Sequence, residues 1–285
     1  MTAHVDVLDL VSRLKAADEP FVLATVVRTV SVTAAKAGAK AIIRPDGRVE
    51  AGWIGGGCAR GATLKAAREA LADGRSRLIS IQPEDLLDEL GVKPGEQRAG
   101  VKFAKNMCPS QGTMDIFVEP MLPRPSLVVL GSSPVALALA GQARQLGFHV
   151  TLAAPFGEFA EMLEADRLVD GFGIGAPQSA QRFVVVSTQG KGDEEALRAA
   201  LAIEAGYHGF VGSRRKMAAL RQSLAGAGVA AEALDRVKAP AGLDIGAITP
   251  EEIALSILAE IVVVRRAGQR GEAAREPHGS SRKSG

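Results

Sequence analysis

A run of glycines that ends in a cysteine is the segment of this sequence best suited to bind a ligand. Gly55, Gly56 and Gly57 follow a predicted strand, and Cys58 and Arg60 begin a predicted helix. The first amides of a helix carry a partial positive charge and have no partner inside the helix, and glycine lets an anion approach them closely. A helix start also favours the thiolate form of a cysteine. The segment therefore predicts an anion cradle beside a reactive thiol; the alternative is a tight turn with a small buried thiol.

The second cysteine, Cys108, lies at the end of a predicted loop that carries Arg98, Lys102 and Lys105. Cationic neighbours favour the thiolate, so Cys108 is a second candidate for ligand binding; the alternative is an inert loop cysteine. A structural zinc site needs four Cys or His ligands at short spacings, and the histidines of this sequence stand far from both cysteines. Two cysteines in 285 residues also favour a reducing compartment over a disulfide-stabilised secreted protein.

Gly131, Ser132 and Ser133 follow another predicted strand, at the position of the phosphate loop in dinucleotide-binding folds. The pattern is not Gly-x-Gly-x-x-Gly, and residues 151–155 lack the acidic residue expected about 20 residues further on. The fingerprint for a nicotinamide cofactor therefore fails twice. An anion at this helix start and a purely structural turn both remain open.

A cluster of cations forms the third candidate helix start, where Ser213 precedes Arg214, Arg215 and Lys216. Cations at this position oppose the helix dipole, and the arrangement becomes favourable if a phosphate docks among them. The alternative is a solvated basic face. The sequence shows no Ser–His–Asp set and no Gly-x-Ser-x-Gly motif, so we assign no catalytic residue.

The elements that position these segments differ between the two halves of the chain. The first half is predicted to be mixed α+β, and its stretch between 81 and 114 is predicted to be a long loop. The expected elements are a helix over 5–15, a strand over 21–27, a hairpin of strands 41–44 and 48–54, a helix over 58–71, and strands over 78–81 and 114–118.

Three prolines within residues 120–125 predict a linker, after which strands and helices alternate. The expected strands are 127–130, 148–153, 183–187 and 208–212, and the expected helices are 134–146, 194–204 and 214–225. This order is typical of a doubly wound parallel sheet and predicts a Rossmann-like domain. Thr249 and Glu252 form a capping box that opens a last, apolar helix running to about Arg266.

The chain is thus expected to be an α/β protein with an N-terminal α+β domain over 1–122, a Rossmann-like domain over 126–266 and a disordered tail over 267–285. A formal net charge of +2 gives no bulk attraction to nucleic acid or to an anionic membrane. Residues 1–15 do not resemble a signal peptide, and no uncharged apolar run reaches the roughly 18 residues of a membrane-spanning helix. These features predict a cytoplasmic protein.

Several motifs resemble those of the XdhC/CoxI family, the maturation factors of xanthine dehydrogenase and carbon monoxide dehydrogenase. In the first domain these are Leu-Ala-Thr-Val-Val at 23–27, Gly-Ala-Lys at 38–40 and Gly-Gly-Gly-Cys at 55–58. In the second they are Gly-Ser-Arg-Arg-Lys at 212–216 and, most specifically, Pro-Ala-Gly-Leu-Asp-Ile-Gly-Ala at 240–247 followed by the helix that begins Thr-Pro-Glu-Glu-Ile.

The resemblance implies a maturation factor, not an enzyme, that binds molybdopterin with its molybdenum and protects this molybdenum cofactor from oxidation. It also implies that the cofactor is presented to a cysteine desulfurase for sulfuration and delivered to an apo-molybdenum hydroxylase, and we expect a homodimer. Cys58 is then the candidate ligand of molybdenum. The cofactor needs anion-ready helix starts for its phosphate and tolerates a thiol beside its dithiolene.

The sequence departs from the family pattern at several positions. The loop at 131–134 lacks the usual histidine, Ala153 and Ala154 replace an acidic residue, Thr188 and Gln189 stand where a histidine is usual, and the glutamate expected after Cys58 is displaced. These departures suggest a divergent branch, of the CoxF type. The alternatives are an NAD(P)-dependent oxidoreductase, which the fold allows, and a subunit-docking protein with a vestigial Rossmann domain.

Overall fold

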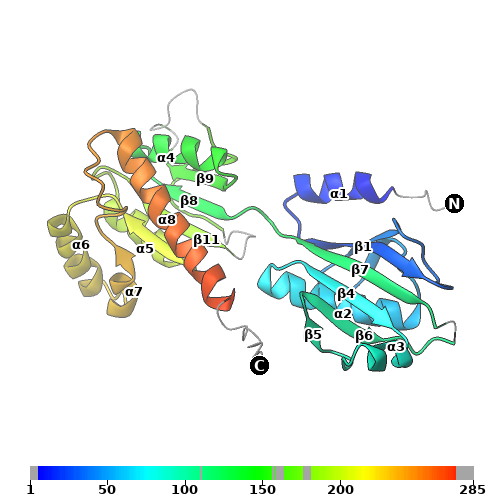
Figure 1. Ribbon diagram of the computed structural model, residues 1–285. Helices are drawn as coiled ribbons and strands as arrows, with labels where there is room; N and C mark the ends of the chain where they lie inside the picture. Colours follow the sequence, from blue (N-terminus) through cyan, green and yellow to red (C-terminus); the bar gives the residue numbers. More distant parts are fainter. Residues whose placement is uncertain (1–5, 110, 156, 158–163, 176–180, 274–285) are drawn as a thin grey trace, which may run out of the picture. The chain divides into compact units, whose positions relative to one another are not determined.

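The computed structural model divides the chain into two compact units, Met1–Pro123 and Arg124–Gly285 (Figure 1). The structure describes residues 6–109, 111–155, 157, 164–175 and 181–273. None of the described helices combines the length and the hydrophobicity that crossing a bilayer requires.

The first unit is built on a seven-stranded sheet in the order β3-β2-β1-β7-β4-β6-β5. The sheet is mainly antiparallel, and β6 runs parallel to β4. The strands are β1 (Phe21–Val30), β2 (Lys40–Ile43), β3 (Val49–Gly52), β4 (Arg77–Gln82), β5 (Gln97–Arg98), β6 (Val101–Lys105) and β7 (Thr113–Met121). The predicted hairpin is confirmed as β2–β3, and Gly47 takes the positive φ of its turn.

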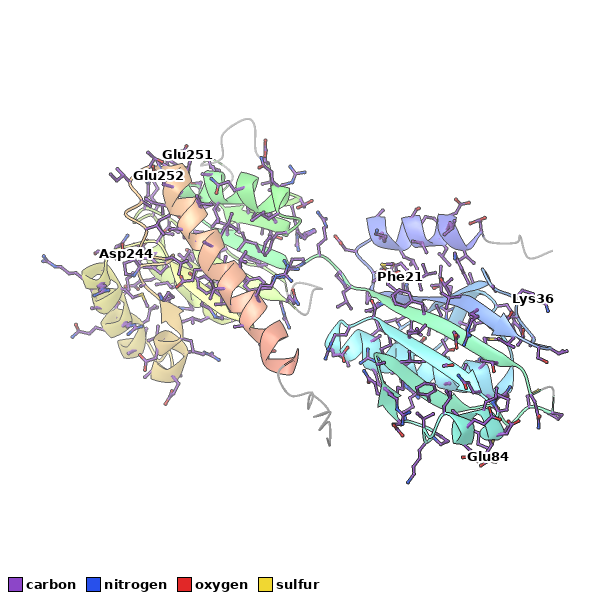
Figure 2. The ribbon with its side chains drawn as sticks, viewed as in Figure 1. Phe21, Lys36, Glu84, Asp244, Glu251 and Glu252 are labelled. Carbon is purple, nitrogen blue, oxygen red and sulfur yellow. The ribbon has the colours of Figure 1, made fainter. Side chains whose placement is uncertain are left out.

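A helix covers each face of this sheet. Successive residues of β1 point to opposite faces, so each helix packs against a different set of β1 side chains. Val22 faces the long helix α2 (Gly57–Asp73), which packs through its buried alanines. Phe21 faces α1 (Val7–Ala16), where Leu10 and Leu14 cover it (Figure 2). Asp6 caps α1 by accepting hydrogen bonds from the amides of Leu8 and Asp9 at 2.7 and 3.3 Å, which explains why the helix begins there.

The segment between β4 and β7 is not the predicted long loop. It contains α3 (Glu84–Glu89), β5 and β6, so the prediction was wrong there. Strand β6 contains two lysines, and these charged residues favoured the prediction of a solvent-exposed loop. Their charges are paired with side chains from elsewhere: Lys102 Nζ lies 2.7 Å from Glu69 of α2, and Lys105 Nζ lies 2.6 Å from Glu84.

The second unit is a parallel six-stranded sheet in the order β10-β9-β8-β11-β12-β13, as the predicted Rossmann-like fold requires. Its strands are β8 (Ser126–Leu130), β9 (His149–Ala154), β10 (Arg167–Asp170), β11 (Arg182–Val186), β12 (Tyr207–Phe210) and β13 (Val237–Lys238). The short strands β10 and β13 were not predicted. β8 lies at the centre of the strand reversal, where such folds usually bind ligands.

Two layers of helix enclose this sheet (Figure 1). The apolar faces of α4 and α8 pack against Leu127 and Val129, whereas α5, α6 and α7 pack against Val128 and Leu130. The helices are α4 (Pro134–Gln145), α5 (Asp193–Leu201), α6 (Arg214–Gly226), α7 (Ala231–Asp235) and α8 (Pro250–Ala273). Successive residues of β8 therefore contribute to the two hydrophobic cores on opposite faces of the sheet.

Helix α8 begins at the predicted capping box. Glu252 accepts hydrogen bonds from the amides of Ile248 and Thr249 at 2.8 and 3.0 Å, and its own amide donates to Thr249 Oγ1 at 3.3 Å. Figure 2 shows Glu251 and Glu252 at this end of α8. The helix continues to Ala273, so the predicted tail does not begin at residue 267; residues 274–285 lie outside the described part of the chain.

Candidate functional site

A cavity of about 320 Å3 lies in the first unit, where three separate segments meet. One wall is the loop after β1, the second is the turn into α2, and the third is the loop between β6 and β7; Ile81 and Met114 form part of its surface. The lining residues are Val32, Thr33, Ala34, Gly55, Gly56, Gly57, Cys58, Ala59, Ile81, Asn106, Met107, Cys108, Gly112 and Met114. The structure thus brings the two predicted cysteine segments together.

The start of α2 borders this cavity and carries no side-chain cap within the described chain. Gly56 is the N-cap residue, and the first bond of the helix runs from the Arg60 amide to the Gly56 carbonyl at 3.3 Å. The amides of Gly57, Cys58 and Ala59 precede that bond and make no backbone hydrogen bond within the described chain. These amides are the groups that the sequence analysis predicts will bind an anion.

Glycine is required at the turn into α2 for a specific reason. Gly55 has a φ of +104°, which L side chains rarely adopt, and a Cβ there would lie 3.3 Å from the Ala59 side chain and 3.6 Å from that of Met114. The tight turn keeps the first amides of α2 at the surface of the cavity.

The Cys58 thiol is half-buried rather than sealed within the core. Its Sγ accepts a hydrogen bond from the Met107 amide at 3.3 Å. Cys108 is the next residue and is exposed. The third wall of the cavity thus places the second cysteine directly after the amide that contacts the first.

Asn106 fixes the conformation of this third wall. Its amide nitrogen Nδ2 donates to the Gly112 carbonyl at 2.7 Å, and its Oδ1 accepts from the Cys108 amide at 2.9 Å. Gly112 in turn packs so closely on the first wall that an added Cβ would lie 2.2 Å from the Val32 carbonyl oxygen. Hydrogen bonds within the third wall and its close packing on the first wall therefore shape this part of the cavity; residue 110 lies outside the described part.

The described lining carries no charged side chain. Arg60, which was predicted to take part, is exposed and does not line the cavity. Attraction for an anion would come from backbone amides rather than from Arg60. The side chains contribute sulfur and hydrocarbon instead.

The start of α4, the second predicted site, is closed by the protein's own side chains. Ser133 Oγ accepts from the Ala136 amide at 3.1 Å and shares a 2.6 Å hydrogen bond with Ser187 Oγ. A Cβ on Gly131 would lie 2.1 Å from the Ser187 carbonyl oxygen, so this glycine serves close packing between β8 and β11. Ala154 is fully buried at the end of β9, where a ribose-binding acid would stand.

The cationic start of α6 is partly neutralised. Ser213 caps the helix, with its Oγ accepting from the Lys216 amide at 3.2 Å. Lys216 Nζ lies 2.7 Å from Asp193 Oδ2. Burial alone would raise the pKa of Asp193, but hydrogen bonds from Lys216 and Thr188 and the charge of Lys216 outweigh it and lower that pKa. Only Arg214 and Arg215 of the three predicted cations are exposed.

A second cavity of about 650 Å3 lies in the second unit, between the start of α6, the segment 238–247 and α8. Glu260, buried on α8, accepts hydrogen bonds from the Tyr207 hydroxyl at 2.7 Å and the Gly242 amide at 2.8 Å and pairs with Lys238 at 2.8 Å. Burial, together with Glu260, raises the pKa of Tyr207. Sequence reasoning missed this network; its signal was an acidic residue beside the apolar stripe of the last helix.

The fold defines a two-domain α/β protein with a cavity in its N-terminal domain and a Rossmann fold in its second domain. The sequence model of the XdhC and CoxI family matches residues 14–82, and that of the XdhC Rossmann domain matches residues 127–261. The two matches together cover most of the chain. The chain belongs to the XdhC and CoxI family.

Two curated relatives are similar to this chain. The uncharacterized protein YqeB of Escherichia coli is 30% identical over 263 residues, which are 89% of this chain and 45% of YqeB. A Bacillus subtilis protein, named as a probable xanthine dehydrogenase subunit, is 28% identical over 162 residues, which are 54% of this chain and 47% of that protein. The chain therefore spans about half the length of the curated relatives it matches. A crystal structure described as a xanthine dehydrogenase from Bacillus halodurans is 20% identical, with coverages of 96% and 98% and a TM-score of 0.42.

Proposed function

We propose that this protein is a chaperone for molybdenum cofactor. It binds molybdopterin with its molybdenum as cargo, shields it from oxidation, supports its sulfuration and inserts it into a molybdenum hydroxylase of the xanthine dehydrogenase or carbon monoxide dehydrogenase type. Family membership and the cavity in the N-terminal domain support this proposal.

The observation that carries the proposal is an uncapped helix start that borders a cavity beside a half-buried thiol. The amides of Gly57, Cys58 and Ala59 suit the cargo's phosphate. Cys58 suits its sulfur-bound molybdenum, since thiolates are ligands for soft and borderline metals. The apolar walls suit the pterin ring. A volume of about 320 Å3 lies at the lower end of the roughly 300–1,000 Å3 typical of small-molecule pockets.

The partners follow from the same proposal. A xanthine dehydrogenase is suggested by the name of the Bacillus subtilis relative, and a cysteine desulfurase is the chemical class of enzyme that supplies sulfur. We include a homodimer in the proposal, and cytoplasm as its compartment. In this proposal the residues that line the cavity bind the cofactor and catalyse no reaction.

The experiment that tests this function compares two ligands on the full chain. The protein is purified without oxygen from cells that make molybdenum cofactor, analysed for molybdenum and pterin, and titrated with NADH and NADPH. The proposal expects pterin and molybdenum in a fixed ratio to protein and no saturable nicotinamide binding. Nicotinamide binding without pterin would support the oxidoreductase alternative instead, although the closed start of α4 disfavours it. Binding of neither would leave a docking protein.

A further inference from the structure

Exposed hydrophobic side chains of the second unit are concentrated in one short stretch of the chain. Among the described residues of this unit, eight large hydrophobic side chains are exposed, and six of them lie between positions 243 and 263. Three belong to the segment before α8 and three to α8 itself: Leu243, Ile245, Ile248, Leu255, Val262 and Val263. Clustered apolar side chains at a surface are typical of an interaction site.

The segment before α8 lies against that helix. The Leu243 amide donates to the Ser256 carbonyl at 3.2 Å, and the Ile248 amide donates to the Glu252 carboxylate at 2.8 Å. Ile248 is 84% exposed although the hydrogen bond fixes its backbone. The apolar side chains of the segment and of α8 therefore belong to one region of the surface.

The two sides of α8 differ in what they contact. One side packs into the core of the second unit through Ala254, Ile257, Leu258 and Ile261. The opposite side carries Leu255, Ala259 and Val262, whose spacings of four and three residues align them along the helix. Leu255 is 55% exposed and Val262 is 37% exposed, so burial within the chain does not account for this second stripe.

Charged residues of opposite sign stand at the two ends of the stripe. Glu251 lies one turn before Leu255, and Arg266 lies one turn after Val262. Both charged residues are exposed, and Figure 2 shows Glu251 at the first end of the helix. The stripe thus runs from an acid through apolar side chains to a base, with the small residue Ala259 near its middle.

We propose that this stripe of α8 is the surface through which two copies of the chain form a dimer. The two helices lie antiparallel across a two-fold axis that passes near Ala259. In a two-fold interface, a contact from one residue to a second is repeated from the second to the first. Leu255 of each copy packs on the partner's Val262, and Glu251 pairs with the partner's Arg266.

The spacing of the residues favours a second copy over a different protein. Leu255 and Val262 lie equally far from the midpoint between positions 258 and 259, and so do Glu251 and Arg266. Antiparallel packing of identical helices therefore places apolar on apolar and acid on base, whereas parallel packing would bring like charges together. The small side chain of Ala259 allows a short distance between the helix axes.

This surface specifies the homodimer included in the proposed function and rests on that part of the proposal alone. The tests below use the full chain without bound cofactor, so their failure leaves cofactor binding untouched. Loss of cofactor binding in the earlier experiment would, in turn, leave the dimer untouched. The two failures can therefore be told apart.

The first test measures the mass of the full chain in solution by analytical ultracentrifugation over a range of concentrations. We expect the parent protein to be a dimer. Leu255→Glu places an unpaired charge at the apolar centre of the interface in each copy and should weaken dimerisation at least about 100-fold. Leu168→Glu is a matched control, because this leucine on β10 is 45% exposed and lies outside the stripe. It should leave the dimer intact, and circular dichroism checks that each variant is folded.

Charge reversal tests the antiparallel arrangement. Glu251→Arg and Arg266→Glu each replace two ion pairs of the dimer with contacts between like charges and should weaken dimerisation about 10-fold. Combining both changes in one chain should restore the dimer, as should mixing the two single variants, because each pair again joins opposite charges.

Three results would overturn the proposal. A parent protein that stays monomeric up to about 100 µM would leave the stripe to the first unit or to another protein. A dimer that Leu255→Glu does not weaken would use a different surface. Failure of the double variant and of the mixture to restore the dimer would exclude the antiparallel pairing of Glu251 with the partner's Arg266.

Discussion

Replacing Gly56 with aspartate should stabilise the protein and at the same time close the candidate cradle. Gly56 is the N-cap of α2, with φ −97° and ψ −175°, an extended conformation open to any L residue. A Cβ at this position would meet no atom within 4 Å. An aspartate there can accept a hydrogen bond from the amide of Cys58 or Ala59, which are the groups we assign to the cargo's phosphate.

The stabilisation can be estimated from three contributions. Aspartate is better than glycine at an N-cap by a few tenths of a kcal/mol. Its charge at the helix start adds about 0.3–1 kcal/mol. Removing a glycine from the unfolded chain adds about 0.4–1 kcal/mol. The free energy of unfolding of the N-terminal domain should therefore rise by about 1–2 kcal/mol, and Tm by roughly 2–8 °C.

The same change should weaken cofactor retention strongly. One or two charge-assisted hydrogen bonds to the phosphate, each worth about 1.5–3 kcal/mol, are replaced by a bond within the protein. A loss of about 3 kcal/mol corresponds to roughly a 100-fold lower affinity. Differential scanning calorimetry measures the first effect, and molybdenum and pterin per chain after anaerobic purification measure the second.

Two control variants make the result specific. Gly56→Asn caps the same amides without a charge and should lose most of the retention, because occupied amides matter more than repulsion. Ala230→Asp adds a cap to α7, which has no side-chain cap among the described residues, and should raise stability without changing retention. Full retention by Gly56→Asp together with the expected rise in Tm would refute the assignment of these amides to the phosphate.

Three further predictions concern the thiols, the basic helix start and the buried acid. Cys58→Ala should lower cofactor retention more than Cys108→Ser, measured as pterin per chain; equal retention in both variants and the parent would remove the thiol from the mechanism. Arg214→Ala combined with Arg215→Ala should lower cofactor affinity and its dependence on salt, whereas an unchanged affinity at low salt would indicate a solvated face. Glu260→Leu should destabilise the C-terminal domain by about 2–5 kcal/mol in urea unfolding, because it leaves buried donors without an acceptor. Burial alone would raise the pKa of Glu260, but Lys238 and its hydrogen-bond donors lower that pKa below the ordinary 4.5. The stability that the ionised Glu260 contributes is therefore complete above about pH 5 and is lost as the pH falls below 4.5. Equal stability of the parent protein and Glu260→Leu at pH 7 would contradict this role of Glu260.

Local patterns in the sequence predicted the second sheet well. Strands β8, β9, β11 and β12 were predicted as short runs rich in apolar residues, and three of the helices carry their own start signals, which are Ser133, Ser213 and the capping box at Thr249. The short strand β13 was missed because two residues carry no periodicity. Its pairing with β12 depends on contacts with distant residues.

The N-terminal domain was harder to predict because its cavity depends on contacts between distant segments. β6 resembled a loop since its two lysines find their partners on α2 and α3. The first wall of the cavity was not predicted at all: Val32 pairs with Gln111, far along the chain. The two cysteine segments could be singled out by residue type, but only the sheet order shows that they share a cavity.

The three helix starts that the sequence analysis singled out as candidate anion sites differ in their N-cap residue. This residue decides whether the first amides of the helix are open to a ligand. Ser133 and Ser213 occupy the N-cap positions of α4 and α6, and each hydroxyl accepts a bond from an amide of its own helix. Gly56 occupies the same position in α2 and has no side-chain oxygen to offer. A ligand at α4 or α6 must therefore compete with an intramolecular bond, whereas a ligand at α2 satisfies amides that the described chain leaves to solvent. In the Rossmann domain the place of the usual nucleotide loop joins β8 and β11 through Ser133 and Ser187, so of these three helix starts only that of α2 lacks a side-chain cap within the described chain.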